Sequence, residues 1–382
     1  MWWGWVKMKV AIFDADLIGR EKHRFPNLVC EKLSGYWKER GADVMLMTTF
    51  PSPLEWEAWE YEYDETYISK VFTDTVMPDH ISASEHVHLG GTGFYFDKAP
   101  ALPDEIEHHM PDYKLYDDWI GAAHGEQFKW YKDYSIGFLT RGCFRKCPFC
   151  VNQKYDHVFP HSPLEEFLEP SRKKICFLDD NFFGCSKWRE LLTGVMATGK
   201  RFVFRQGLDE RLLTDEKAEL LFNANYDGDY TFSFDNIADY ELIRKKLAII
   251  DKYNVRRQNV KFYVLVGFES TDAQDIENAF KRIELLFHYH CMPYLMRYMG
   301  KDDAPWKHSK YKSLYTTMAR WCNQPRFIKK MSFREFCQAN QAAQKGGGVC
   351  SALRSMADFE KEYPEIAKRY FDMRFGESED EQ

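Results

Sequence analysis

The chain has 382 residues, of which 45% are hydrophobic and 16% aromatic, and its formal net charge is -7. This composition excludes a disordered protein, and the length exceeds what one hydrophobic core usually supports, so we expect about two domains. The net charge gives no overall electrostatic signature of nucleic-acid binding, although a local basic patch is compatible with it.

The ten cysteines stand at irregular spacings, and no signal peptide or apolar run of membrane-spanning length accompanies them. This pattern indicates a reducing compartment rather than a disulfide framework. We therefore expect a cytoplasmic protein with no membrane partner. Residues 1–7 precede the first predicted strand, and we expect them to be an extension or the product of an upstream start.

The first predicted domain, residues 8–99, alternates strands with a helix. Residues 9–16 form a β-rich apolar run, residues 26–41 have helical spacing of apolar side chains, and residues 43–50 read as the next strand. Shorter strands follow at residues 67–72 and 86–89. Strand, helix and strand at this spacing predict a parallel, doubly wound sheet of the Rossmann type.

A glycine-rich turn follows the last of these strands, with Gly90, Gly91 and Gly93 around Thr92. In a doubly wound sheet such a turn lets the backbone approach a ligand closely beside a helix N-terminus. Gly90, Gly91 and Gly93 are therefore a candidate ligand site. A plain tight turn is the alternative.

Residues 100–134 read as a connector rich in Asp, Glu, His, Pro and aromatic residues, with little periodicity. His108 and His109 invite interpretation as metal ligands. Adjacent side chains point apart, however, so we expect a solvated pair instead.

Strands and helices alternate regularly over residues 135–299. The predicted strands are residues 135–139, 174–180, 201–209, 230–235, 260–268 and 292–298. The predicted helices start at residue 163 and then run over residues 186–199, 214–225, 239–253 and 272–288, with Ser186 and Thr214 as N-caps. These strand–helix units predict a partial (β/α)6 barrel, whose chemistry would sit at the C-terminal ends of the strands.

The first of these strands leads into the sequence TRGCFRKCPFCVN, residues 140–152. Cys143, Cys147 and Cys150 form C-x3-C-x2-C, with no fourth cysteine beside them. A [4Fe–4S] cluster normally takes four thiolates, so three would leave one iron open to another ligand. A zinc site is the alternative, but zinc favours a second cysteine pair or histidines at matched spacing.

This loop, including Phe149 before the last cysteine, resembles the cluster motif of the radical S-adenosylmethionine (SAM) enzymes. The resemblance implies a partial-barrel enzyme in which SAM chelates the open iron. Reduction then cleaves SAM to a 5′-deoxyadenosyl radical, which abstracts hydrogen from a substrate that the sequence does not identify. The resemblance also implies a reductant such as flavodoxin or ferredoxin. A non-catalytic iron–sulfur or zinc protein that binds nucleic acid is the alternative of another class.

The resemblance also implies SAM contacts at the strand ends. Asp179 and Asp180 stand where the family contacts the SAM amino group, and a carboxylate suits an ammonium group. Arg205 suits the SAM carboxylate, although a salt bridge from Arg205 to Asp209 or Asp235 is the alternative. The remaining candidate cofactor contacts are Asn181, Gln206, Ser233, Asp235 and Gly267.

The order of elements before the loop resembles the cobalamin-binding-type domain of one branch of this family. Cobalamin is therefore a candidate cofactor, and a cobalamin-dependent methyltransferase is an alternative function. The Asp-x-His-x-x-Gly motif, whose histidine ligates cobalt in some cobalamin proteins, is missing, because His23 stands in the wrong register. The alternative is a Rossmann-like domain that packs or holds substrate.

Basic and aromatic residues interleave over residues 297–345, which suits a nucleic-acid groove with stacking platforms. We favour the alternative, in which residues 300–375 are a mostly helical cap with buried aromatics and solvated lysines. Cys322, Cys337 and Cys350 match no compact cluster motif. Residues 376–382 predict an acidic, disordered tail.

Overall fold

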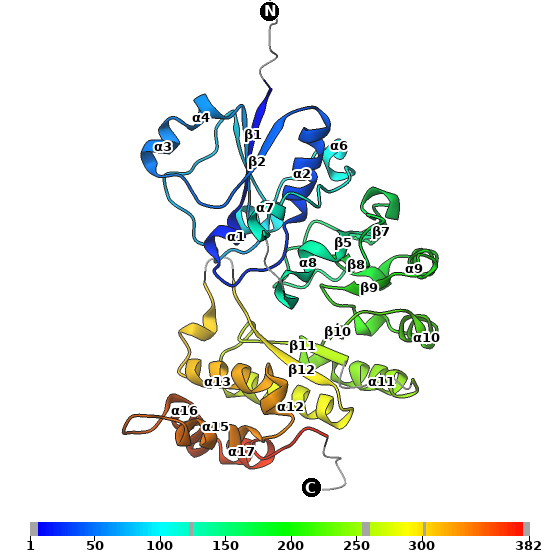
Figure 1. The fold of residues 1–382 in the computed structure, drawn as a ribbon. Helices are drawn as coiled ribbons and strands as arrows, with labels where there is room; N and C mark the ends of the chain where they lie inside the picture. The colour runs from blue at the N-terminus through cyan, green and yellow to red at the C-terminus, as the bar shows by residue number, and fades with distance from the viewer. Residues whose placement is uncertain (1–6, 122–124, 254–259, 301–302, 377–382) are drawn as a thin grey trace, which may run out of the picture. The chain divides into compact units, whose positions relative to one another are not determined.

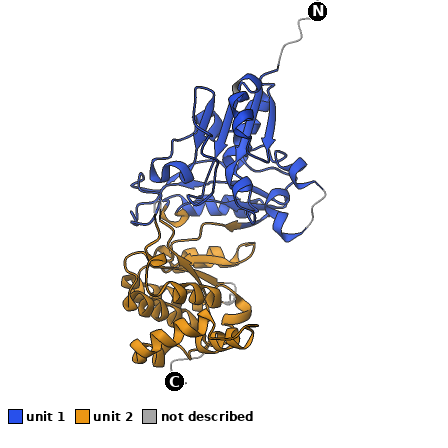
Figure 2. Ribbon diagram, turned by 90° about the vertical axis from the view of Figure 1, so that its left-hand side faces the viewer, with its two compact units in different colours: residues 1–180, 185–202 blue, residues 181–184, 203–382 orange. Residues whose placement is uncertain are grey.

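The computed structural model describes residues 7–121, 125–253, 260–300 and 303–376 (Figure 1). The chain divides into two compact units, residues 1–180 with 185–202 (unit 1) and residues 181–184 with 203–382 (unit 2), as coloured in Figure 2. The boundaries of these units differ from the predicted domain boundaries, and the predicted domains stay a prediction. Apart from Lys7 and Gly376, the predicted N-terminal extension and acidic tail lie outside the described residues.

Unit 1 begins with a four-stranded parallel sheet of order β2-β1-β3-β4. Its strands are β1 (Lys9–Asp14), β2 (Asp43–Met47), β3 (Glu65–Ser69) and β4 (Val87–Gly90). Strand β1 is buried from Val10 to Asp14, which is typical of a strand covered on both faces. The predicted parallel sheet is confirmed here.

Helix α2 (Leu28–Glu39) packs against this sheet and buries Leu33 beside Val10 and Ile12. Asn27 caps it, because the Asn27 side chain accepts a hydrogen bond from the Val29 N–H at 3.1 Å. The other helices before residue 100 are short: α1 (Ala15–Gly19), α3 (Pro53–Glu57), α4 (Trp59–Glu62) and α5 (Thr92–Tyr95).

The predicted connector is packed into unit 1. Its helices are α6 (Asp104–Glu107), α7 (Asp117–Ile120) and α8 (Lys129–Lys132). Apolar side chains of this segment join the core of the first sheet: Ile106, Leu115, Tyr116, Ile120 and Tyr131. The absence of helical periodicity in the sequence reflects helices too short to show it.

His108 and His109 contact different glutamates and do not act together. The His108 Nδ1 lies 2.7 Å from Glu166 Oε2, and the His109 Nε2 lies 3.0 Å from Glu39 Oε2. The prediction of a solvated pair therefore holds for His108, which is exposed, and not for His109, which is half-buried.

A second sheet has the order β5-β8-β9, with β5 (Tyr134–Gly137) parallel to β8 (Lys174–Phe177). The unit boundary falls inside β9 (Arg201–Phe204). The helix predicted from residue 163 is wrong: only the 3-10 helix η3 (Leu164–Glu166) forms, because Pro163 and Pro170 bracket too short a stretch. Helix α9 (Trp188–Ala197) starts after Lys187, so the predicted Ser186 cap is also wrong.

Unit 2 contains the parallel sheet β10-β11-β12, formed by β10 (Tyr230–Ser233), β11 (Val260–Val266) and β12 (Met292–Arg297). Its helices are α10 (Asp215–Asn223), α11 (Tyr240–Asp251) and α12 (Ala273–His288). Thr214 caps α10 as predicted, with its hydroxyl accepting from the Lys217 N–H at 3.3 Å. All the strands predicted over residues 135–299 therefore form, although they are hydrogen-bonded as two three-stranded sheets, β5-β8-β9 and β10-β11-β12.

The C-terminal region is helical, as predicted. It consists of α13 (Lys312–Cys322), α14 (Pro325–Ile328), α15 (Phe333–Ala342), α16 (Ser351–Glu362) and α17 (Pro364–Tyr370). Six aromatic side chains that interleave with the basic residues are at most 6% exposed: Trp306, Tyr311, Tyr315, Trp321, Phe333 and Phe336. These rings are core residues and not free to stack on bases, so the nucleic-acid partner stays a prediction. No helix within the described residues is long and apolar enough to cross a membrane.

Candidate metal centre in the cysteine loop

The three cysteines of the C-x3-C-x2-C motif lie in one loop of unit 1, closed at its base by a short antiparallel ladder. Strand β6 (Thr140–Arg141) pairs with β7 (Phe159–Pro160), with Thr140 opposite Pro160. Gly142 starts the loop with φ +94°, and a Cβ at this position would collide with the His157 carbonyl oxygen. Only glycine allows the two ends of the loop to approach this closely.

Backbone amides point at two of the three sulfurs. The Arg145 N–H donates to Cys143 Sγ at 3.5 Å, and the Asn152 N–H donates to Cys150 Sγ at 3.5 Å. Amide donors of this kind stabilise thiolates and are one of the means by which a protein adjusts an iron–sulfur cluster. Phe149, just before the last cysteine, is half-buried, as are all three cysteines.

The three thiols are near enough to influence one another. Burial raises the pKa of Cys150, and the neighbouring Cys147 and Cys143 add to the rise, whereas the Asn152 N–H lowers it. Within the described residues, no three His, Cys, Asp or Glu side chains are already arranged to hold a metal ion. Three thiolates are the type of ligand that an iron–sulfur cluster takes, and the binding of metal stays a prediction.

Two aspartates at the end of β8 hold this loop. Asp179, which is 2% exposed, accepts hydrogen bonds from the Leu139 N–H at 3.1 Å, the Thr140 N–H at 2.7 Å and the Thr140 hydroxyl at 2.6 Å. Burial nevertheless raises its pKa to about 7. Asp179 thus fixes the segment that leads into the cysteine motif.

Asp180 contacts both sides of the motif. One carboxylate oxygen accepts from the Gly142 N–H at 3.0 Å, and the other accepts from Asn152 Nδ2 at 2.8 Å. Because Gly142 precedes the first cysteine and Asn152 follows the last, one carboxylate spans the whole motif. Asp179 and Asp180 therefore position the loop, and their contact with SAM stays a prediction.

The remaining predicted cofactor contacts belong to unit 2. Asn181 Nδ2 donates to Asp209 Oδ2 at 3.4 Å, and Asp209 also pairs with Arg211 at 2.7 Å. Arg205 and Gln206 are exposed after β9, and Ser233 is half-buried at the end of β10. The cofactor contacts predicted for Asn181, Arg205, Gln206 and Ser233 therefore stay predictions.

Asp235 and Gly267 have structural partners in unit 2. Asp235 Oδ1 accepts from the Leu265 N–H at 3.2 Å, and burial raises the pKa of Asp235 to about 6. Gly267 has φ +69°, and a Cβ there would lie 2.7 Å from the Cβ of Trp306. Trp306 therefore covers Gly267, which gives this glycine a packing reason beside the predicted adenine contact.

The glycine turn after β4 packs against the loop that follows β3. Gly91 has φ +101°, and a Cβ on Gly91 would collide with the Lys70 carbonyl oxygen. That loop is held in turn by Asp16, which accepts from the Val71 N–H at 2.7 Å. Gly93 is packed in the same way, because a Cβ there would lie 2.5 Å from Lys70 Cγ. Close packing thus accounts for Gly91 and Gly93. A ligand contact by Gly90, Gly91 or Gly93 stays a prediction.

No family model matches this chain, and no curated protein resembles it closely enough to be a match. Two solved structures are similar to it: the cobalamin-dependent S-adenosylmethionine radical enzyme OxsB with aqua-cobalamin and S-adenosylmethionine bound, and the apo, SeMet-labelled form of OxsB. Both are 12% identical over 97% of this chain, which spans 64% and 57% of their lengths. The TM-scores are 0.46 and 0.36, and at such values the similarity carries no argument about fold or activity.

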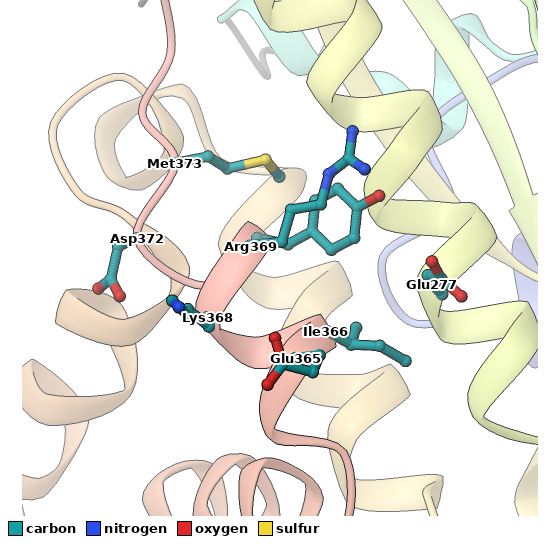
Figure 3. A pocket seen from close by; sticks show the side chains of 8 residues that line it. Glu277, Glu365, Ile366, Lys368, Arg369, Asp372 and Met373 are labelled. Carbon is teal, nitrogen blue, oxygen red and sulfur yellow. The ribbon is translucent and has the colours of Figure 1, made fainter. Parts of the chain in front are cut away.

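A surface hollow of about 650 Å³ lies in the C-terminal region, between α12 and α17 (Figure 3). Two of the charged side chains that line it have partners: Arg369 pairs with Glu284 at 3.3 Å, and Asp372 pairs with Arg334 at 2.9 Å. None of the predicted site residues lines this hollow. We assign it no ligand.

Proposed function

We propose that this chain is a radical SAM enzyme in which Cys143, Cys147 and Cys150 hold a [4Fe–4S] cluster. The observation that carries the proposal is the C-x3-C-x2-C loop itself, which follows a parallel strand of an α/β fold, is closed at its base and directs amides at two sulfurs. The alternation of strands and helices from β8 to β12 supports it, because a partial barrel has the same alternation.

When bound, such a cluster supplies the electron for reductive cleavage of SAM to a 5′-deoxyadenosyl radical. The chain itself contributes three thiolates, which leave one coordination position for SAM. Asp180 is half-buried and not fully enclosed, and we propose that it also accepts a hydrogen bond from the SAM ammonium group. We propose flavodoxin or ferredoxin as the electron donor.

The test is anaerobic reconstitution with iron and sulfide, followed by addition of dithionite and SAM. We expect about four irons per chain and formation of 5′-deoxyadenosine, measured by mass spectrometry. The Cys147→Ala variant should lose both. Cys350→Ala is the matched control, because Cys350 is also half-buried but caps helix α16. An intact, reduced cluster without 5′-deoxyadenosine would contradict the enzyme and favour an electron carrier.

A cobalamin-dependent methyltransferase is a second candidate. The observation that favours it is the parallel order β2-β1-β3-β4, which places a topological switch point between β1 and β3. Doubly wound sheets bind their ligands at such points. Reconstitution with hydroxocobalamin, followed by gel filtration, tests it. A retained corrinoid spectrum would support this candidate, and a colourless protein would remove it.

A further inference from the structure

The base of the cysteine loop contacts a carboxylate that the motif does not include. Glu107 ends helix α6, and its Oε1 accepts from Arg141 Nη2 at 3.3 Å and from His161 Nε2 at 2.9 Å. Arg141 is the last residue before Gly142, and His161 directly follows β7. One carboxylate oxygen therefore binds the residues on both sides of the loop.

The same oxygen also binds the first sheet's helix. Lys32 of α2 donates to Glu107 Oε1 at 3.0 Å, and the Lys32 ammonium also contacts the Glu107 backbone carbonyl. The side chains of Lys32, Glu107 and His161 are only 6%, 16% and 14% exposed. Charges interact more strongly when they are shielded from water. We therefore expect these contacts to stabilise the fold more than an ion pair at the surface does.

The charges in this group fix the direction of the hydrogen bonds. Burial alone would raise the pKa of Glu107, but the His161 hydrogen bond and the charges of Lys32 and Arg141 hold it well below its usual range. An ionised carboxylate only accepts hydrogen bonds, so the Nε2 of His161 carries the proton.

Arg141 and His161 are each held on a second side. The Arg141 guanidinium lies 3.3 Å from the centroid of the Phe138 ring, in a cation–π contact. The His161 ring lies 5.0 Å from the His108 ring, and Glu166 holds His108 in place. The two donors that meet Glu107 are thus restricted to one arrangement.

We propose that Glu107 is a positioning residue that holds the two ends of the cysteine loop together and so limits how far apart the three thiols can move before a cluster binds. Its relevance to catalysis rests on the proposed function. Its effect on the loop does not, because the contacts of Glu107 are all with residues of the chain itself. Asp180 acts within the motif, and Glu107 acts at its base.

The first test is limited proteolysis of the metal-free full chain with trypsin, which can cut the loop at Arg145, Lys146 and Lys154. In Glu107→Gln, which keeps the size of the side chain but removes its charge, we expect cleavage in the loop to be about tenfold faster. Cleavage after Lys329 and Lys330 in unit 2 is the internal reference and should keep its rate. The matched control is Glu105→Gln in the same helix, because Glu105 instead accepts from the Tyr36 hydroxyl at 2.8 Å.

Equal loop cleavage in Glu107→Gln, Glu105→Gln and the unchanged chain would overturn the proposal. If Glu107→Gln does not fold, His161→Asn takes its place, since it removes one loop contact and leaves the Lys32 and Arg141 pairs. Faster loop cleavage in His161→Asn supports the proposal, and unchanged cleavage overturns it.

The second test measures iron content and the electron paramagnetic resonance signal after reconstitution. We expect Glu107→Gln to bind less iron and to give a broadened signal, while Glu105→Gln matches the unchanged chain. If the unchanged chain binds no iron, the proposed function fails, and proteolysis still decides the role of Glu107. If Glu107→Gln gives unchanged iron, signal and proteolysis, the proposed function stands and the role of Glu107 fails.

Discussion

Glu107 and Glu210 are both withdrawn from water, yet their surroundings differ in kind. Glu107 accepts from Lys32, Arg141 and His161, and its pKa is lowered. Glu210, in the 3-10 helix η5 (Glu210–Leu212), is 0% exposed, and within the described residues neither of its carboxylate oxygens has a hydrogen-bond partner. Burial raises the pKa of Glu210 well above its ordinary value. The partners, and not the burial, decide which of the two is charged.

The largest expected effect is on Glu107. Glu107→Gln leaves two cations without their carboxylate and should lower the free energy of unfolding by about 3 kcal/mol at pH 7. A lowered pKa contributes stability above the unfolded-state pKa, so the loss should shrink as the pH falls below about 4.5. Urea unfolding followed by circular dichroism, at pH 7 and at a pH below 4.5, measures this loss of stability. A loss that does not depend on pH would contradict an ionised Glu107.

Asp179 is the intermediate case, because it is buried with hydrogen-bond donors but no cation. Asp179→Asn keeps the shape but offers one acceptor oxygen where the Leu139 N–H and the Thr140 N–H require two. We expect a loss of about 2 kcal/mol in the same unfolding measurement, since one amide is left unpaired. A neutral effect would show that Asp179 is already protonated and weakly bonded.

Replacing Glu210 should have the opposite effect on the free energy of unfolding, because it should stabilise the chain. Its folded pKa is raised, so the unchanged chain loses stability as the pH rises above 4.5, the ordinary value. Glu210→Gln has no such proton, and its stability relative to the unchanged chain should increase by about 1.4 kcal/mol per pH unit above that value. Thermal unfolding from pH 5 to 7 tests this. Parallel pH profiles for the two chains would mean that Glu210 is ionised when folded.

The smallest effect belongs to Glu105. Its carboxylate is exposed and accepts from the Tyr36 hydroxyl, so Glu105→Gln should change the free energy of unfolding by less than about 0.5 kcal/mol. The same urea titration measures it beside Glu107→Gln. A loss as large as that of Glu107→Gln would show that any charge change in α6 destabilises unit 1. The effect of Glu107→Gln could then not be assigned to the contacts of Glu107.

The sequence predicted the strands well because apolar β-rich runs carry their own signal. Residues 174–180 and 260–268 contain β8 and β11, and the Thr214 cap is where the sequence places it. Predictions failed where proline spacing shortened a helix, after Pro163, and where a turn delayed one, after Ser186. Local patterns decide elements only when no neighbouring turn competes.

For the candidate site, the sequence indicates the proposed ligands but not the residues that support the loop. Cys143, Cys147 and Cys150 are visible from spacing alone, and the carboxylates after β8 are visible from their place at a strand end. Glu107 is not, because it comes from a segment without periodicity and meets Arg141 only in the folded chain. Contacts between residues far apart in sequence leave no pattern that a single sequence can show.

The ladder between β6 and β7 has a consequence for metal uptake. Closing a flexible loop costs chain entropy, and the cost is larger when both ends are free. Here the ladder pairs Thr140 with Pro160 and Arg141 with Phe159, so most of that entropy is lost when the chain folds into this ladder. Under the proposed function, iron would bind to a loop whose ends are joined, and its binding free energy would not have to close that loop.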